Sequence, residues 1–234
     1  MQVDVITIFP GMCQGFFDYG ILHQAIRKGL FRLELVDLRE FTTDRHRTVD
    51  DRPYGGGEGM VLKPEPLFRA VERCRQGERK PWVVYPSPQG SRFTQEKAVE
   101  LSRKSHLTFI CGRYEGVDQR ALDDLVDEEI SMGDFVVTGG ELPALLMVDA
   151  IVRMIPGVVG KPASLEQESF ANGLLDYPQY TRPATYRDRA VPEVLLSGNH
   201  KEIRSWREEQ ALRRTRDRRP DLLASGASSA RAKG

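Results

Sequence analysis

The stretch SMGDFVVTGGELPALLMVDAIVRM, residues 131–154, decides how the sequence is interpreted. It contains an apolar run rich in β-branched residues, 135–138, which predicts a strand. After Gly139 and Gly140, apolar residues recur at helical spacing, which predicts a helix over 142–155. A strand is therefore expected to enter a helix through a glycine turn, where α/β proteins bind ligands. The turn matches neither G-x-G-x-x-G nor G-x-x-x-x-G-K-[ST], which excludes the usual dinucleotide and phosphate-loop interpretations.

Similar apolar runs alternate with helical patterns along most of the chain. Strands are predicted at 2–9, 31–38, 81–85, 107–111 and 135–138, and helices at 12–28, 64–76, 94–104, 117–126 and 142–155, with Thr94 as a helix cap. This alternation is typical of the α/β class. Because the strands are continuously apolar, we predict a largely parallel, doubly wound sheet with helices on both faces.

The composition of the sequence changes after Pro156, where glycine, proline and polar residues follow without a sustained hydrophobic periodicity. We predict a domain over 1–160, a flexible linker over 161–172 and a small, mainly helical C-terminal domain over 173–234. The last eleven residues, ASGASSARAKG, are expected to form a disordered tail.

Composition is that of an ordinary globular chain. The 234 residues are 40% hydrophobic and 29% charged, and Lys plus Arg number 34, as do Asp plus Glu. Global charge therefore identifies no partner. Three scattered cysteines without a histidine cluster argue against disulfides and zinc. The longest apolar run is interrupted by Asp149 and Arg153, and the N-terminus has no basic segment, so we expect a cytoplasmic protein that does not span a membrane.

Three predicted strands end in unusual loops, over 83–90, 109–116 and 135–143. The carboxyl ends of parallel strands meet at one edge of a sheet, so these loops could converge on one pocket. Their glycines allow close backbone approach, their prolines stiffen the walls, and they contain no lysine for a phosphate. An adenosine-like ligand fits this chemistry better than a triphosphate. The alternative is that each loop is merely a tight turn.

Two charged regions are candidates for nucleic-acid contact. The glycine-rich segment 45–66 carries Arg45, Asp50 and Arg52, and such long loops are usually functional or disordered. Between positions 201 and 219 there are eight basic and four acidic residues. In a helix Arg204, Arg207, Arg214 and Arg218 would share a stripe suited to phosphates, with Lys201 nearby. A solvated surface is the open alternative in both regions. The acidic segment 122–130 is interpreted as a solvated helix end, and no metal site is predicted.

Together the motifs resemble one family, the bacterial tRNA (guanine-N1)-methyltransferases. The resemblance rests on DVITIFPGM, VDDRPYGGGEGM, YPSPQG, CGRYEGVDQR, GDFVVTGGELPAL, RMIPGVVG, ESFANGLLDYPQYTRP and VPEVLLSGNHKEIRSWR, from position 4 to about 207. It implies methyl transfer from S-adenosyl-L-methionine to N1 of the guanosine 3′ of the anticodon, position 37 of the tRNA. It also implies a SPOUT-type fold with a deep trefoil knot, and a homodimer with active sites at the subunit interface. The resemblance leaves Mg²⁺ open as a second cofactor.

The resemblance assigns the glycine turn to a knotted pocket that binds the methyl donor bent, through backbone contacts to adenine. The implied cofactor-binding residues are Tyr85, Pro86, Ser87, Pro88, Gly112, Tyr114, Glu115, Gly116, Met132, Gly133, Asp134, Phe135, Val136, Val137, Gly139, Gly140 and Pro143. Arg45, Asp50, Arg52, Lys201, Arg204, Arg207 and Arg214 are the expected tRNA-binding residues.

Methylation of guanine N1 requires a base, because that nitrogen carries a proton in neutral guanine. The family ordinarily has aspartate just before the SF of its linker, whereas this chain has Glu168, which is one methylene longer and similarly basic. We expect Glu168 to accept the proton; alternatively it is a solvated linker residue, with Glu166 or no residue in that role. Arg153 matches the arginine of RMIPG and is expected to donate to guanine O6.

Two other functions remain open. A ribose-methylating or inactive member of the superfamily would keep the pocket but lack ESFANGLLDYPQYTRP, so the presence of that segment favours the guanine-N1 enzyme. A nonenzymatic RNA-binding protein would need only the arginine-rich helix, and a cofactor-binding measurement separates it from an enzyme.

Overall fold

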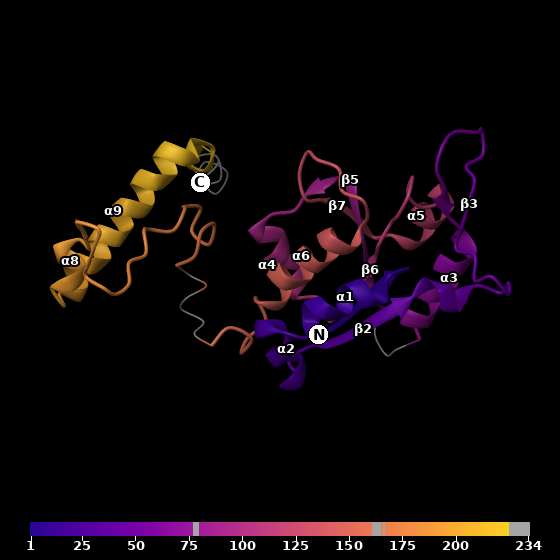
Figure 1. The fold of residues 1–234 in the computed structure, drawn as a ribbon, viewed down its shortest axis with the longest axis horizontal. Helices are drawn as coiled ribbons and strands as arrows, with labels where there is room; N and C mark the ends of the chain where they lie inside the picture. The colour runs from indigo at the N-terminus through magenta and orange to yellow at the C-terminus, as the bar shows by residue number, and fades with distance from the viewer. Residues whose placement is uncertain (77–79, 161–164, 166, 225–234) are drawn as a thin grey trace, which may run out of the picture. The chain divides into compact units, whose positions relative to one another are not determined.

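The computed structural model describes residues 1–76, 80–160, 165 and 167–224 (Figure 1). The chain forms two compact units, Met1–Gly160 and Lys161–Gly234. Of the predicted linker, residues 161–164 and 166 lie outside the described part, and so does the predicted tail from residue 225 onward. Each unit is described by itself.

The first unit is built on a five-stranded parallel sheet with the order β2-β1-β6-β5-β7. The strands are β1 (Gln2–Thr7), β2 (Arg32–Asp37), β5 (Trp82–Arg92), β6 (His106–Ile110) and β7 (Glu128–Ser131). A separate antiparallel pair joins β3 (Asp50–Asp51) to β4 (Val61–Leu62), within a segment that projects from the unit (Figure 1). The predicted α/β class and mostly parallel sheet are confirmed.

Helices cover both faces of this sheet, as predicted. Because successive side chains of a strand point to opposite faces, Val5 of β1 joins one buried apolar cluster and Ile6 joins the other. Helices α1 (Pro10–Phe17), α2 (Gly20–Arg27), α4 (Gln95–Ser102) and α6 (Glu141–Val152) contribute to the first cluster, and η1 (Leu38–Phe41), α3 (Pro64–Cys74) and α5 (Gln119–Leu125) to the second. Thr94 caps α4 as expected, accepting from Lys97 N at 3.2 Å.

Two predicted elements were wrong. Residues 135–138 form no strand; the strand in this region is β7, which ends at Ser131. β7 lies at the sheet edge, so it pairs only with β5 and needs little apolar sequence, whereas Phe135 and Val136 are 59% and 86% exposed. The predicted helix 12–28 is two helices, because Tyr19 is extended and Gly20 has a φ of 72°.

Strand β5 contains an irregularity that shapes the first unit. Pro86 and Ser91 both pair with Ile130 of β7, so the four residues between them bulge out of the ladder. Proline cannot donate to a ladder and is tolerated at a bulge, which accounts for the YPSPQG sequence inside a strand.

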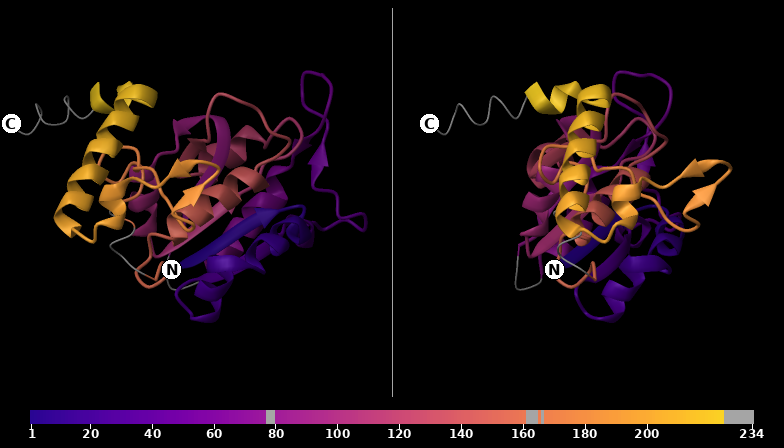
Figure 2. Two further views of the ribbon diagram at one scale, coloured as in Figure 1. Left: turned by 60° about the vertical axis from the view of Figure 1, so that its left-hand side comes forward. Right: turned by 90° about the vertical axis from the view of Figure 1, so that its left-hand side faces the viewer.

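The second unit contains a β8–β9 hairpin (Thr185–Tyr186 and Arg189–Ala190), α8 (Glu193–Leu196) and the long α9 (His200–Arg218), as Figure 2 shows. The Asn199 side chain caps α9 by accepting from Lys201 N and Glu202 N. Buried Thr215 of α9 accepts from Leu175 N at 2.8 Å, which anchors the 175–176 segment on the helix. Among the residues with a described conformation, no helix is long and apolar enough to cross a membrane.

A buried carboxylate lies in the middle of the sheet. Asp4 of β1 is fully buried, and its Oδ2 is 2.6 Å from His106 Nε2 and 3.2 Å from Thr108 Oγ1 of β6. Burial alone would raise the pKa of Asp4, but hydrogen bonds with His106 and Gln2 outweigh it and hold the pKa below its ordinary value. The anionic form therefore stabilises the fold.

We predict that Asp4→Asn lowers the free energy of unfolding at pH 7 by about 2 kcal/mol, since the strands lose a charged hydrogen-bond acceptor. A depressed folded pKa contributes stability above the unfolded pKa of about 3.9 and loses it as the pH falls through the folded value. The deficit of the variant should therefore shrink below about pH 4. Urea unfolding at pH 7 and pH 3 measures both effects, with exposed Asp18→Asn as the control. Equal stability of variant and parent at pH 7 would contradict the prediction.

Candidate active site

Three loops of the first unit enclose one cavity of about 300 Å³. Its walls come from the bulge of β5, from the segment after β6 and from the segment between β7 and α6. These are the loops that the sequence places at strand ends, and they meet because the three strands are adjacent and parallel.

All but one of the predicted cofactor-binding residues line this cavity. They are Tyr85, Pro86, Ser87, Pro88, Gly112, Tyr114, Glu115, Gly116, Met132, Gly133, Phe135, Val136, Val137, Gly139, Gly140 and Pro143. The exception is Asp134, whose side chain is 93% exposed and pairs with Arg92 at 3.1 Å. The structure places Asp134 outside the cavity wall.

Four further residues line the cavity that sequence reasoning missed: Arg113, Ile130, Ser131 and Thr138. Arg113 lies within the quoted CGRYEG motif, of which only Gly112, Tyr114, Glu115 and Gly116 were predicted to bind the cofactor. Ile130 and Ser131 were missed because the strand ending there was misplaced. Ser131 shapes the turn after β7, since its hydroxyl accepts from Gly133 N at 3.1 Å.

A buried ion pair holds the cavity's loops together. Glu141, at the start of α6, is 0% exposed; its Oε2 accepts from Arg113 Nε at 2.8 Å and its Oε1 from the Thr7 hydroxyl at 2.7 Å. Arg113 also donates to Thr138 O at 3.3 Å and lies over the Phe9 ring. The ends of β1 and β6 and the start of α6 are thereby fixed to one another.

Glycines permit the close approach of these segments. Gly140 N donates to Gly112 O at 2.8 Å, and a Cβ at Gly140 would lie 2.9 Å from Cys111 Cα and Gly112 N. The absence of a side chain at Gly140 is therefore required by the approach of two backbone segments. A Cβ at Gly112 would lie 2.6 Å from the Tyr85 hydroxyl. Burial, with the nearby Glu129 and Cys111, raises the pKa of Tyr85 to about 12, so it stays a neutral donor.

The glycine-rich 45–66 segment is attached to the cavity wall. Glu115 N donates to Met60 O and Leu62 N donates to Gly116 O, both at 2.9 Å. Tyr114, which has a φ of 59°, bonds to Asp50, and burial together with that carboxylate raises the pKa of its phenol. Of the predicted tRNA-binding residues in this segment, Asp50 thus lies beside the cavity, and Arg45 and Arg52 are exposed.

In the second unit, Glu168 shares a cavity of about 550 Å³ with Arg204 and Arg207. Lys201 is exposed on the first turn of α9. Arg214 instead donates to Asp176 O at 3.4 Å, so one nitrogen of its guanidinium already forms a hydrogen bond within the unit. The alternative base Glu166 lies outside the described residues.

Arg153 follows the last turn of α6, at the opposite end of that helix from the cavity. Twelve helical residues span about 18 Å, so Arg153 is remote from the cavity of its own first unit. At 100° per residue, Arg153 lies on the same face of α6 as the exposed Leu142 and Leu146.

In the described part of the chain, no three His, Cys, Asp or Glu side chains come together in a group able to hold a metal ion. The acidic 122–130 segment begins in α5, which ends at Leu125, and ends in β7, which begins at Glu128. Only its first part is thus the helix end expected from the sequence.

Known proteins are similar in sequence to this chain along nearly its whole length. Residues 1–225 match the family model described as tRNA (Guanine-1)-methyltransferase TrmD. The chain belongs to this family. It is 54% identical to the tRNA (guanine-N(1)-)-methyltransferase of Bacillus velezensis, over 95% of this chain and 92% of that protein. The enzymes of the same name from Geobacillus kaustophilus and Dictyoglomus turgidum are each 53% identical, over 95% of this chain and 91% and 90% of theirs.

Membership of the tRNA (guanine-1)-methyltransferase family confirms the resemblance drawn from the motifs. The matched region includes the three cavity loops, the Glu141–Arg113 pair and α9. The cavity is therefore the candidate active-site pocket of a family member.

We predict that Glu141→Gln lowers the free energy of unfolding by about 3 kcal/mol, because it leaves the Arg113 guanidinium without its buried counterion. Binding of S-adenosyl-L-methionine, the methyl donor expected from the resemblance, should weaken as well if it occupies this cavity, since the cavity's loops lose their common anchor. Denaturant unfolding and calorimetry measure the two effects. The matched control is Asp134→Asn, which removes an exposed ion pair and should change stability by less than about 0.5 kcal/mol. A Glu141→Gln protein as stable as this control would refute the anchoring role.

Proposed function

We propose that this protein transfers a methyl group from S-adenosyl-L-methionine to N1 of guanosine 37, 3′ of the tRNA anticodon. The observation that carries the proposal is the glycine- and proline-walled cavity, built from three strand-end loops in a chain of the tRNA (guanine-1)-methyltransferase family. The test is transfer of labelled methyl from this donor to tRNA transcripts, with mapping of the modified base.

The cavity suits the proposed methyl donor. Gly116 and Gly133, with φ values of 122° and 138°, leave backbone exposed to a ligand, and Pro86, Pro88 and Pro143 stiffen the walls for a flat adenosine. Glu115 adds an acidic group suited to the cationic methionine portion. When bound there, S-adenosyl-L-methionine supplies an electrophilic methyl group on its sulfonium.

The path of the chain around this cavity supports the proposed SPOUT-type trefoil knot. β7 is an edge strand beside β5, yet the segment after β7 pairs at Gly139 with Arg113, which follows β6 on the other side of β5. The chain therefore crosses the end of β5 before it enters α6. A Cβ at Gly90 would lie 2.3 Å from the Glu129 backbone, so the end of β5 packs tightly against β7 before the chain crosses.

An exposed apolar surface supports a homodimer. Phe9, Met12 and Phe16 at α1, and Leu142 and Leu146 on α6, are between 39% and 55% exposed, and α1 and α6 pack against each other. Apolar patches of this kind mark protein interfaces. Because Arg153 shares a face with the two leucines, dimerisation through α6 would present Arg153 to the partner subunit, which fits an active site shared between subunits.

In the proposed mechanism Glu168 accepts the N1 proton, which frees the nitrogen lone pair. The N1–methyl bond would form as the methyl–sulfur bond of the donor breaks, and neutral S-adenosyl-L-homocysteine would leave. Negative charge then develops on guanine O6, where the Arg153 guanidinium donates and lowers the barrier. Glu168 lines the same cavity as Arg204 and Arg207 of α9, the helix proposed to bind the tRNA phosphates.

We assign tRNA binding to both units. Arg45, Asp50 and Arg52 of the glycine-rich segment would contact the RNA beside the cavity, and Lys201, Arg204, Arg207 and Arg214 of α9 would contact phosphates. In this assignment 1–160 is the cofactor domain, 161–172 a linker and 173–234 the tRNA-binding domain. The buried free cysteines Cys13, Cys74 and Cys111 are consistent with a cytoplasmic location.

We predict that Glu168→Gln lowers single-turnover methyl transfer by about 100-fold or more, because the amide cannot accept the N1 proton. Glu168→Asp should retain much of the rate, and both variants should bind S-adenosyl-L-methionine like the parent. Rapid-quench transfer to tRNA and calorimetry are the measurements. If Glu168→Gln reacts at the parental rate and Glu166→Gln does not, the base is Glu166.

We further predict that Arg153 acts in the partner's active site. Val137→Arg, which places a charged chain in the cavity wall, should block cofactor binding, and Arg153→Ala should remove the O6 donor. Each variant alone should be nearly inactive. Mixed dimers should regain activity, since one of their two sites combines an intact cavity with an intact Arg153. Absence of rescue in verified mixed dimers would place Arg153 in its own subunit's site.

A further inference from the structure

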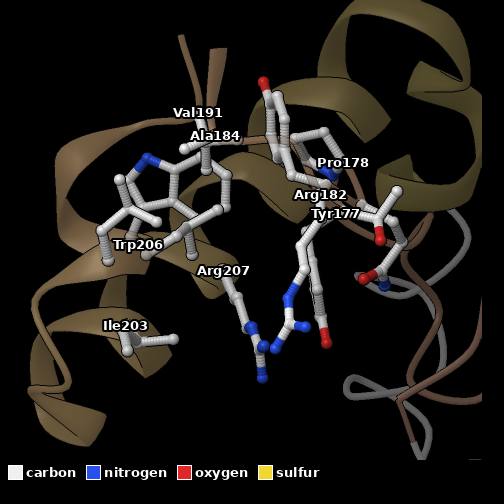
Figure 3. A pocket seen from close by; sticks show the side chains of 13 residues that line it. Tyr177, Pro178, Arg182, Ala184, Val191, Ile203, Trp206 and Arg207 are labelled. Atoms are coloured by element: carbon white, nitrogen blue, oxygen red, sulfur yellow. The ribbon is translucent and has the colours of Figure 1, made fainter. Parts of the chain in front are cut away.

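The second unit contains a cavity that the proposed chemistry does not use. It has a volume of about 380 Å³ and lies between the 177–184 segment, α8 and α9. Figure 3 shows Tyr177, Arg182, Trp206 and Arg207 around it. This size is within the range of small-ligand sites.

One part of the cavity is aromatic. The rings of Tyr180 and Trp206 are 6.3 Å apart and inclined at 54°, and Tyr180 is 49% exposed. Apolar side chains of Val191, Leu195 and Ile203 back this part of the wall. Rings left accessible in this way offer a face on which a planar base can stack.

Another part is cationic. Arg207 lies over the Tyr177 ring at 4.8 Å, and Arg182 and Arg207 both line the cavity (Figure 3). In the part of the chain that the structure describes, neither arginine forms an ion pair, and the buried Arg207 Nε has no hydrogen-bond partner. Two positive charges in the wall of one cavity and an unsatisfied buried donor favour an anionic acceptor.

We propose that this cavity is a second nucleotide site, which takes an unpaired nucleotide of the RNA substrate. Its base would stack against Trp206 and Tyr180, and its phosphate would lie on Arg182 and Arg207. An apolar peptide would leave both guanidinium groups unpaired, and a free anion would leave the rings uncovered. A nucleotide provides both a base for the rings and a phosphate for the guanidinium groups.

This inference rests on the proposed function and adds to it a second site at which the protein binds a nucleotide of its RNA substrate. The cavity shares Tyr177, Ile203 and Arg207 with the cavity that contains Glu168. A nucleotide stacked here is therefore held next to the proposed base. The site recognises an unpaired segment, because a base within a duplex cannot reach the rings.

Fluorescence tests occupancy directly. The chain has two tryptophans, so in a Trp82→Phe background all tryptophan emission comes from Trp206. An RNA hairpin with an unpaired loop should quench this emission to saturation, and a blunt duplex with the same stem should leave it nearly unchanged. Equal quenching by hairpin and duplex, or quenching by neither, would overturn the proposal.

Substitutions test the two parts of the cavity. Tyr180→Ala and Arg182→Ala, both at exposed positions, should each weaken hairpin binding about 10-fold. Arg182→Ala should also reduce the slope of log affinity against log salt by about 1, whereas Tyr180→Ala should not. Matched controls are Tyr186→Ala and Arg213→Ala, an exposed tyrosine and an exposed arginine of the same unit outside the cavity. They should bind the hairpin within about twofold of the parent.

The same variants separate this inference from the proposed function. Cofactor binding should be unchanged in all four. If the parent methylates guanosine 37 but Tyr180→Ala and Arg182→Ala bind the hairpin as the controls do, the nucleotide site is wrong and the function stands. If the parent binds the hairpin through these residues but transfers no methyl to N1, the site stands and the function is wrong.

Discussion

The buried Glu141 carboxylate is the constraint on which the first unit depends. A carboxylate removed from water is costly unless its oxygens are satisfied, and Glu141 receives the Thr7 hydroxyl and the Arg113 guanidinium. It also lies in the first turn of α6, where the helix dipole favours negative charge. These bonds are made only when the ends of β1 and β6 and the start of α6 come together, and that meeting point is a wall of the cavity. The bonds that stabilise the fold at this point are therefore the same bonds that fix the wall of the pocket.

Glycine serves two different purposes around this pocket, and sequence alone does not separate them. At Gly140 the missing side chain lets two backbone segments come into hydrogen-bond contact. At Gly116 and Gly133 it allows left-handed conformations that expose backbone to the cavity. The pattern of glycines predicted a tight site correctly, because both purposes require close approach. Which atoms approach is decided by chain segments far apart in sequence, which no local pattern encodes.

The same distinction explains which parts of the fold could be predicted. β1 and β6 lie inside the sheet, and the edge strand β2 packs Leu33, Leu35 and Val36 against the buried clusters. Their apolar runs therefore located all three strands within a few residues. β7 is a short edge strand of mostly polar residues and carries no such signal. The more apolar 135–138 run was taken for the strand in its place, although its side chains are exposed. Arg113 was missed for a related reason: its partner Glu141 is 28 residues away, and only the crossing of β5 brings them together.

The second unit is stabilised less by buried apolar side chains than the first. Among its described residues Thr215 is buried, but no hydrophobic side chain is buried to the extent seen in the sheet of the first unit. Tyr177, Tyr180 and Trp206 line a cavity where an ordinary domain would close its core around them. With so little apolar burial, this unit derives much of its order from capping and from side-chain bonds to backbone, such as those of Asn199 and Thr215. A ligand that binds only the folded state would stabilise it further. The features that leave this unit weakly packed are thus the features that leave aromatic faces and guanidinium groups available to RNA.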